Sequence, residues 1–242
     1  MGMQSKYFVI YQEIANKIDR GDYKPKEYLP SENELCSIYG TARETIRKAL
    51  NLLAENGYIQ KIRGKGSLVI DRNKFDLPVS GLVSFKEITD KMDEKPSTVV
   101  HMCKLVKASS TIAKQLKVTA QESIWEVKRT REFSDEHVIL DKDYFLERYV
   151  PKLTESIASQ SIYDYLENTL NLKISFAKKE ITVVEPTEED RELLDLEGFQ
   201  HVVVIKNYVY LEDATLFQYT ESRHRPDKFV FVDFARRNKI KT

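Results

Sequence analysis

The sequence predicts an α+β fold of two domains, a small helical N-terminal domain with a hairpin and a larger C-terminal sheet domain. Two short helices with cap residues lie between residues 31 and 55, and a basic hairpin follows them. Residues 82–242 alternate strand-like and helix-like runs, with hairpin turns between neighbouring strands. The stretch 71–81 mixes charge with Pro78 and Gly81 and has no period, which indicates a linker. We therefore expect domains over 1–70 and 82–242.

Composition and charge limit the class of protein. The chain has 242 residues, of which 41% are hydrophobic, enough for two folded cores. No run of 18 apolar residues exists to span a membrane, and the first residues lack the apolar core of a signal peptide. We expect a cytoplasmic protein with no membrane partner, in which Cys36 and Cys103 are reduced. Residues 1–70 hold 11 Lys and Arg against 8 Asp and Glu, a net +3 that suits contact with DNA.

The first two helices are predicted from apolar spacing and caps. A helix over 6–20 has an apolar residue at each helical turn, namely Tyr7, Tyr11, Ile14 and Ile18. A second helix begins at the Ser-x-x-Glu capping box of Ser31 and Glu34 and ends before Gly40. Its buried stripe is expected to consist of Leu35, Ile38 and Tyr39.

A third helix has a basic outer side. Thr41 and Glu44 are expected to form a second capping box at its start. Its core face is expected to consist of Ile46, Ala49, Leu50 and Leu53. The outward side near the N-terminal end is left with Arg43, Thr45, Arg47 and Lys48. A recognition helix contacts base edges with this end.

A hairpin with a basic glycine tip follows the third helix. Its strands are predicted over 58–62 and 67–70, with Arg63-Gly64-Lys65-Gly66 at the tip. Glycines there remove side-chain bulk, so the backbone and Lys65 can approach DNA phosphates or a minor groove. The alternative is a small helical domain with ordinary solvated charges. The order of capped helix, glycine turn, arginine-bearing helix and basic hairpin favours a winged helix-turn-helix that binds duplex DNA.

The second domain is predicted to be a largely antiparallel sheet with helices packed on it. Strands are expected over 98–107, 123–133, 137–147, 173–184, 200–211, 214–225 and 228–234. Helices are expected over 84–92, 110–117, 153–159, 161–170 and 187–196. The pairs Asp135-Glu136 and Glu212-Asp213 are placed as hairpin turns between strands.

The strand over 123–133 carries two arginines on its apolar face. Alternation places Arg129 and Arg131 with Trp125, Val127 and Phe133, while the charged and polar residues between them face water. Inward guanidinium groups are costly unless they are paired. One solution is an internal salt-bridge network with Asp141 and Asp143 on the next strand, and the other is a bound anion such as a phosphate ester. The spacing alone leaves both open.

Further polar groups favour the bound anion. Ser161 opens a helix, where its hydroxyl and free N–H groups can hold an anion. One face of the strand over 214–225 carries four hydrogen-bonding side chains, Gln218, Thr220, Ser222 and His224. Such a row is unusual for a core and suits a sugar.

Several motifs resemble those of a known family. Four motifs of this chain resemble those in the DNA-binding half of GntR-type bacterial transcription regulators. They are Leu-Pro-Ser-Glu-x-Glu-Leu, Arg-x-Thr-Ile-Arg-x-Ala-Leu, Leu-x-x-x-Gly-Tyr-Ile and Gly-Lys-Gly-Ser. This resemblance implies DNA contacts by Arg43, Thr45, Arg47, Gly64, Lys65 and Gly66. Ala42 stands where the family usually has a serine, so one possible phosphate hydroxyl is lost. We interpret Glu44 as a helix cap and not a base contact.

The second half resembles the HutC-like branch of the same family, which has a chorismate-lyase-like effector domain. The shared pattern is Arg-x-Arg, Ser-Ile-Tyr-x-Tyr-Leu and Tyr-x-x-Ser-x-x-Arg-x-Asp-x-Phe. The resemblance implies that the phosphate is held by Arg129, Arg131, Ser161 and Tyr163, and that the sugar is held by Asp141, Gln218 and His224. Ser222 is added to the sugar residues because it lies on the same strand face as Gln218 and His224. Gln218 replaces a glutamate of amino-sugar sensors, which argues against that ligand.

The similarity is strongest to the members of this branch that control trehalose utilisation, and it covers nearly the whole chain. It implies trehalose 6-phosphate as the effector, with sucrose 6-phosphate and free trehalose left open. We therefore expect a homodimeric repressor of a palindromic operator, with no cofactor. A protein regulated by partner proteins is a second hypothesis.

Enzymatic and metal chemistry are the remaining alternatives. A lyase or sugar-phosphate hydrolase could use Asp141 or Asp143 as a general base, but no activated nucleophile accompanies them. The four histidines are scattered and have no cysteine partners at ligand spacing, so no metal site is predicted. The sequence predicts a protein that is not an enzyme.

Overall fold

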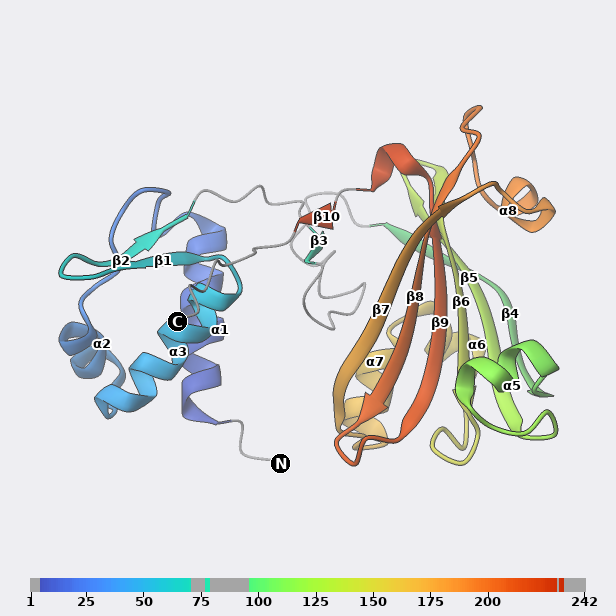
Figure 1. Cartoon of the computed structure of the whole chain (residues 1–242), viewed down its shortest axis with the longest axis horizontal. Helices are drawn as coiled ribbons and strands as arrows, with labels where there is room; N and C mark the ends of the chain where they lie inside the picture. Colours follow the sequence, from blue (N-terminus) through green and yellow to red (C-terminus); the bar gives the residue numbers. More distant parts are fainter. Residues whose placement is uncertain (1–4, 71–76, 79–95, 230, 233–242) are drawn as a thin grey trace, which may run out of the picture. The chain divides into compact units, whose positions relative to one another are not determined.

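The computed structural model describes residues 5–70, 77–78, 96–229 and 231–232. Contacts divide the chain into two units, one formed by Met1–Ser80 with Phe231–Thr242 and the other by Gly81–Val230 (Figure 1). The linker expected over 71–81 and the helix expected over 84–92 fall almost entirely outside the described residues, so both stay predictions. Each unit is described by itself.

The first unit consists of three helices and a hairpin. The helices are α1 (Lys6–Arg20), α2 (Glu32–Tyr39) and α3 (Arg43–Glu55), and the hairpin strands are β1 (Ile59–Ile62) and β2 (Gly66–Val69). This order confirms the predicted winged helix-turn-helix, and β1 pairs with β2 in an antiparallel register. The short strands β3 (Leu77–Pro78) and β10 (Phe231–Val232) pair in parallel.

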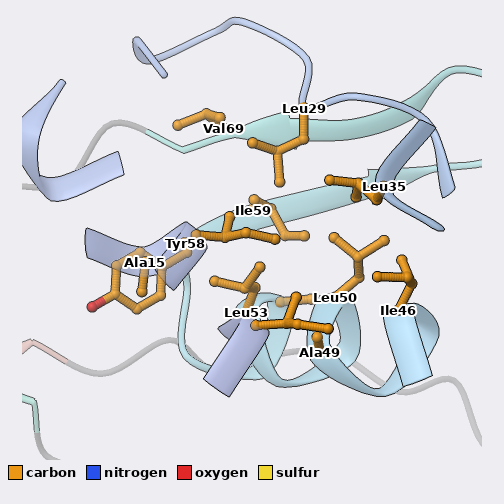
Figure 2. Close-up of a cluster of buried hydrophobic side chains, with 13 residues drawn as sticks. Ala15, Leu29, Leu35, Ile46, Ala49, Leu50, Leu53, Tyr58, Ile59 and Val69 are labelled. Carbon is orange, nitrogen blue, oxygen red and sulfur yellow. The ribbon is translucent and has the colours of Figure 1, made fainter. Parts of the chain in front are cut away.

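The core of this unit lies between α1, α2, α3 and the hairpin. Figure 2 shows Leu50 and Leu53 of α3 directed toward Ile59 of β1. All four residues predicted for the inner face of α3 are buried, because they recur at helical spacing on one side of the helix. Burying each large aliphatic side chain stabilises the fold by about 1.5–3 kcal/mol. The core therefore fixes α3 with its basic side outward.

Two local predictions about the helix-turn-helix need correction. The capping box of Ser31 and Glu34 is present at α2. At α3 the N-cap is Ala42, which has no side-chain acceptor, so the predicted box of Thr41 and Glu44 is wrong. The helix begins one residue later than that box requires. Ile38 is also not part of the buried stripe, since its side chain is 60% exposed.

The second unit is built on a six-stranded antiparallel sheet in the order β4-β5-β6-β9-β8-β7. Its strands are β4 (Ser97–Lys107), β5 (Ser123–Phe133), β6 (Glu136–Leu146), β7 (Ile174–Val184), β8 (Val202–Leu211) and β9 (Leu216–His224). These match six predicted strands to within two residues at each end. The turn between β5 and β6 is formed by Ser134 and Asp135, whose φ values are 49° and 64°. Paired positive φ is typical of two-residue hairpin turns, so this turn lies one residue earlier than predicted.

The seventh predicted strand differs from the expectation. Residues 228–234 were expected to form a strand of the second domain. The structure instead has a 3-10 turn at Pro226–Lys228, followed by β10, which pairs with β3 in the first unit. Proline has no backbone N–H to donate to a strand pair, so Pro226 is placed to end the ladder of β9.

Helices cover both faces of the sheet (Figure 1). They are α5 (Ser110–Leu116), α6 (Glu155–Ser159), α7 (Ile162–Asp164) with a π-helical turn at Tyr165–Thr169, and α8 (Glu188–Leu193). One apolar cluster joins α6 and α7 to Val127 and Phe145, and another joins α5 to Tyr144 and Tyr219. The indole Nε1 of Trp125 donates to the carbonyl of Val150, 2.8 Å away. The face under α6 and α7 is the one that carries Arg129.

Candidate nucleic-acid interface and ligand site

The outer side of α3 presents its basic residues to solvent. Arg43, Arg47 and Lys48 are exposed, and Thr45 is half-buried, while the residues between them form the core. An exposed basic edge at the N-terminal end of this helix has the chemistry to contact phosphates and base edges.

Carboxylates pair with both arginines of this edge. The Nε of Arg43 lies 2.7 Å from Glu32 Oε2, and Arg47 Nη1 lies 3.9 Å from Glu44 Oε2. The Arg43 side chain is 67% exposed, so water screens this pair and it contributes little to stability. Glu44 therefore contacts Arg47 instead of capping the helix. Both guanidinium groups can exchange these partners for DNA at small cost.

The tip of the hairpin needs glycine at two positions. Gly64 and Gly66 have φ values of 77° and 108°, in the region that other residues rarely adopt. A Cβ on Gly66 would lie 3.7 Å from Cδ1 of Tyr28, which is ordinary contact, so the backbone angle is the constraint. Arg63 and Lys65 are exposed beside them. The predicted wing is therefore present with a basic tip.

The two arginines of β5 face inward, as predicted. Arg129 is 6% exposed and Arg131 is 4% exposed. Each pairs with a carboxylate of β6: Arg129 Nη2 lies 2.5 Å from Asp143 Oδ2, and Arg131 Nε lies 2.9 Å from Asp141 Oδ2. The internal salt-bridge network is therefore present. Two opposite charges in each pair make the cluster neutral, which lets it stay buried.

The network does not satisfy every buried polar atom. The carbonyl of Ala158 in α6 accepts from Arg129 Nη1 at 3.1 Å. The Nε of Arg129 is buried and has no hydrogen-bond partner, and neither does Nδ1 of His224. A buried donor without a partner costs about 1–3 kcal/mol, more when it is charged. An acceptor from a ligand would remove that cost.

The polar row of β9 lies beside the aspartates. Gln218 Nε2 and the Thr220 hydroxyl both donate to Asp143 Oδ1, at 3.2 and 2.8 Å. The Ser222 hydroxyl donates to Asp141 Oδ1 at 2.5 Å, and Nε2 of His224 lies 2.9 Å from the same hydroxyl. The register explains this, because Asp141 is opposite Ser222 and Asp143 is opposite Thr220.

Burial and charge set the protonation states of this cluster. Burial alone would raise the pKa of Asp141, but Arg131, Arg129 and the Ser222 hydroxyl hold it below its usual value. Burial lowers the pKa of His224 to about 4, although Asp141 opposes this shift. At neutral pH the site therefore contains an ionised Asp141 and a neutral His224.

The segment from α6 to α7 supplies two further predicted residues. The Tyr163 hydroxyl donates to Gln218 Oε1 at 3.3 Å, which joins it to the cluster. Ser161 caps α7, and its hydroxyl accepts from the N–H of Asp164 at 3.2 Å. Ser161 lies three residues after Ala158, whose carbonyl holds Arg129. The structure thus brings Tyr163 into the network and leaves Ser161 engaged as a helix cap.

Sequence reasoning missed Thr98 of β4. Its hydroxyl accepts from Arg131 Nη1 at 2.6 Å. Thr98 is opposite Arg131 in the β4–β5 register, so alternation along β4 would place it on the arginine face. The pairing of these two strands was the missing information.

Comparison with known proteins now identifies the family. Residues 6–69 match the family described as bacterial regulatory proteins, gntR family, and residues 91–230 match the UTRA domain. This chain belongs to the GntR family of transcription regulators, with a UTRA domain. GntR regulators bind operator DNA and an effector ligand, and the two matched regions correspond to the winged helix unit and the sheet unit.

Individual relatives cover almost the whole chain. The HTH-type transcriptional regulator TreR of Bacillus subtilis is 57% identical over 97% of this chain and 99% of its own length. The mannosyl-D-glycerate transport/metabolism system repressor MngR of Escherichia coli is 29% identical over 98% of each chain. These relatives are transcription regulators, and this GntR regulator is not an enzyme.

Solved structures show the same architecture. The possible transcriptional regulator YydK of B. subtilis has a TM-score of 0.79 at 26% identity, over 96% of this chain and 100% of that one. The effector binding domain of the B. subtilis trehalose repressor has a TM-score of 0.56 at 58% identity, over 59% of this chain and 99% of that one. The fold prediction, including the effector domain, is confirmed.

In the part of the chain that the structure describes, no helix of this regulator is long and apolar enough to cross a membrane. No group of three or more potential metal-ligating side chains occurs among the same residues.

Proposed function

We propose that this GntR regulator represses a trehalose utilisation operon and is released from its operator by trehalose 6-phosphate. The single observation that carries the ligand assignment is the pair of buried arginines, one with an unpartnered Nε, beside a row of hydroxyl and amide groups. The 57% identity to TreR and the 58% identity to a trehalose repressor effector domain support the sugar.

The phosphate would bind at the arginine end of the cluster. Arg129 and Arg131 would donate to its oxygens, with Ser161 and Tyr163 contributing from the α6–α7 segment. Arginine forks suit phosphate because two parallel N–H bonds match two oxygens. If a phosphate binds the guanidinium groups, Asp141 and Asp143 would lose part of their ion pairs with the arginines and would need other hydrogen-bond donors.

Sugar hydroxyls would supply those donors. Asp141 accepts hydrogen bonds, and Gln218, Ser222 and His224 each offer a donor or an acceptor to a ring hydroxyl. The neutral His224 has an unpartnered Nδ1 that can accept or donate, depending on its tautomer. The two ion pairs therefore place donors for the phosphate at one end of the site and acceptors for the sugar beside them.

The DNA would be bound by two copies of the winged helix unit. Arg43, Thr45 and Arg47 would contact one half-site, with Gly64, Lys65 and Gly66 at the adjacent backbone. A homodimer on a palindrome places its half-sites about one helical turn, roughly 34 Å, apart. The regulator would act in the cytoplasm, where its DNA lies.

Release by a panel of sugars tests this function. We expect trehalose 6-phosphate to release operator DNA in a gel shift at lower concentration than sucrose 6-phosphate, glucose 6-phosphate or free trehalose. Calorimetry on the full chain should give the same order. If none of these ligands binds, the effector assignment is wrong, while DNA binding would remain.

The variant Arg129→Ala tests the phosphate end. It should bind the operator but resist release, with ligand affinity reduced at least a hundredfold, as expected for a charged hydrogen bond worth about 3 kcal/mol. Arg129→Lys keeps a positive charge beside Asp143, so it serves as a second variant if Arg129→Ala does not fold. Arg148→Ala, on an exposed arginine of the same unit, is the matched control and should respond as wild type. Release of Arg129→Ala at wild-type concentrations would refute the phosphate role.

A further inference from the structure

The polar face of the sheet continues beyond the residues assigned above. Asn207 of β8 is opposite Thr220 of β9, and Lys179 of β7 is opposite Asn207. Directly opposed residues of antiparallel strands point to the same face. Thr220 donates to Asp143, so Asn207 and Lys179 share the face of the ligand cluster.

Asn207 is an unusual residue for this position. Its face neighbours on β8, Ile205 and Val209, are buried and apolar. Its Oδ1 is buried and has no hydrogen-bond partner. Burying such an atom without a partner is unfavourable, so a leucine of similar size would be more favourable here for stability alone. Polar groups that reduce stability in this way occur at functional sites.

Lys179 brings a cation to the same place. Its side chain is half-buried, and burial lowers its pKa from the ordinary value. Lys178, the preceding residue, points to the opposite face and pairs there with Glu180, at 2.5 Å. The neighbouring lysines therefore differ in environment, although both belong to one edge strand.

We infer that Asn207 and Lys179 form the far end of the ligand site and hold the second hexose ring of a phosphorylated disaccharide. This inference rests on the proposed function and adds the basis of disaccharide specificity. The strands β5 and β8 are three spacings apart, or about 14 Å. This span is close to the length of a phosphate with two linked hexose rings, whereas a phosphate with a single ring would end nearer to β9.

The chemistry of the two side chains fits hydroxyl groups. The Asn207 Oδ1 accepts from a hydroxyl, and its amide donates to another. The Lys179 ammonium donates to hydroxyl oxygens. Because these groups lie beyond the arginines, they add affinity only for a ligand long enough to reach them.

Two variants compared on two ligands test the inference. Asn207→Leu and Lys179→Met should each lower the affinity for trehalose 6-phosphate about tenfold, the loss expected for one hydrogen bond of about 1.4 kcal/mol. The affinity for glucose 6-phosphate should change less than twofold. Lys178→Met, on the opposite face, should match wild type for both ligands. Calorimetry with the full chain gives these values.

Stability of the ligand-free protein separates this role from a structural one. Asn207→Leu should unfold at the same or a higher temperature than wild type, because it removes an unpartnered buried oxygen. Wild-type affinity for trehalose 6-phosphate in both variants would overturn the inference, and so would equal losses for the two ligands. If the inference fails but Arg129→Ala abolishes release of DNA, the proposed function is still supported. If wild type binds neither ligand, the proposed function itself is wrong.

Discussion

At the scale of single residues, the arginines proposed to bind DNA and the effector are each paired with a carboxylate. Arg43 is held by Glu32, and Arg129 by Asp143. The first pair is exposed and weak, whereas the second is buried. Loss of the buried partner is costly unless an equally good acceptor replaces it, so the proposed sheet site would favour strong anions.

Arg43 should contact a base or a phosphate of the operator, and a single substitution can measure its contribution to operator affinity. We expect Arg43→Ala to lower operator affinity by about 1–3 kcal/mol if the side chain makes a bidentate base contact. A footprinting titration at fixed salt measures this. Lys24→Ala, on an exposed lysine of the turn before α2, is the control and should bind nearly as wild type. Unchanged affinity in Arg43→Ala would remove it from the interface.

His224 should make stability fall in mild acid. Its folded pKa is about 4, against an ordinary 6.5. Between these values the unfolded chain binds a proton that the folded chain excludes, so the free energy of unfolding decreases as the pH falls. The loss between pH 7 and 4.5 should be roughly 2 kcal/mol.

Urea unfolding of wild type and His224→Gln across this range isolates the effect. The variant has no imidazole to protonate and should lose less stability than wild type. Asp141 stays ionised there, since its pKa lies below its usual value. Parallel pH profiles for the two proteins would contradict the assignment.

At the scale of elements, strand alternation was the strongest source of correct predictions. It placed Arg129 and Arg131 on the inner face of β5 because one buried face fixes the register of a strand. It could not give their partners. Arg129 bonds Asp143 although Asp141 is directly opposite it, and that diagonal choice depends on the pairing of β5 with β6.

Helix ends were less predictable. Within the helix-turn-helix the sequence has two Ser/Thr-x-x-Glu patterns, at Ser31 and at Thr41, and only the first forms a capping box. The start of α3 is set by the glycine turn before it, where Gly40 has a φ of 52°. One residue of difference moves Glu44 out of reach of the cap. A local pattern therefore identifies a helix start only to within a residue or two.

The two capping patterns provide a matched pair of variants. Ser31→Ala should lower the stability of the winged helix unit by about 1 kcal/mol, because it removes a cap for a free N–H. Thr41→Ala should cost much less, since Thr41 caps nothing. Chemical unfolding of both variants tests this. Equal losses would mean that the Thr41 hydroxyl has a role that its position does not explain.

Successive residues of β9 point to opposite faces of the sheet, so this strand contacts groups on both. Ser222 and His224 lie on the face of Asp141, while Arg223 between them binds Asp190 of α8 on the other face, through Nε and Nη2 at 2.6 and 2.7 Å. Asp190 is completely buried. A ligand that shifts the backbone of β9 therefore acts on α8 as well.

At the scale of the whole molecule, a DNA unit and a ligand unit are joined in one chain. If the ligand weakens operator binding by some factor, the operator must weaken ligand binding by the same factor. For allosteric proteins in general the factor is typically about 5- to 150-fold. Release of DNA by the ligand therefore requires a change in both affinities, that for the operator and that for the ligand.

Calorimetry in the presence of operator tests this coupling. Trehalose 6-phosphate should bind the operator complex more weakly than the free regulator, by the factor seen in release of DNA. A scrambled duplex of equal length is the control and should leave ligand affinity nearly unchanged. Equal ligand affinities with and without operator would show that the sugar phosphate does not control DNA binding.

The position of Trp125 provides an optical signal in the unlabelled protein. It is the single tryptophan of the chain, four residues before Arg129 on the same face of β5, and its indole is tied to the carbonyl of Val150. Indole emission responds to polarity and to hydrogen bonding. Ligand titrations can therefore be followed by intrinsic fluorescence. Stopped-flow mixing would then give the association and dissociation rates of the effector.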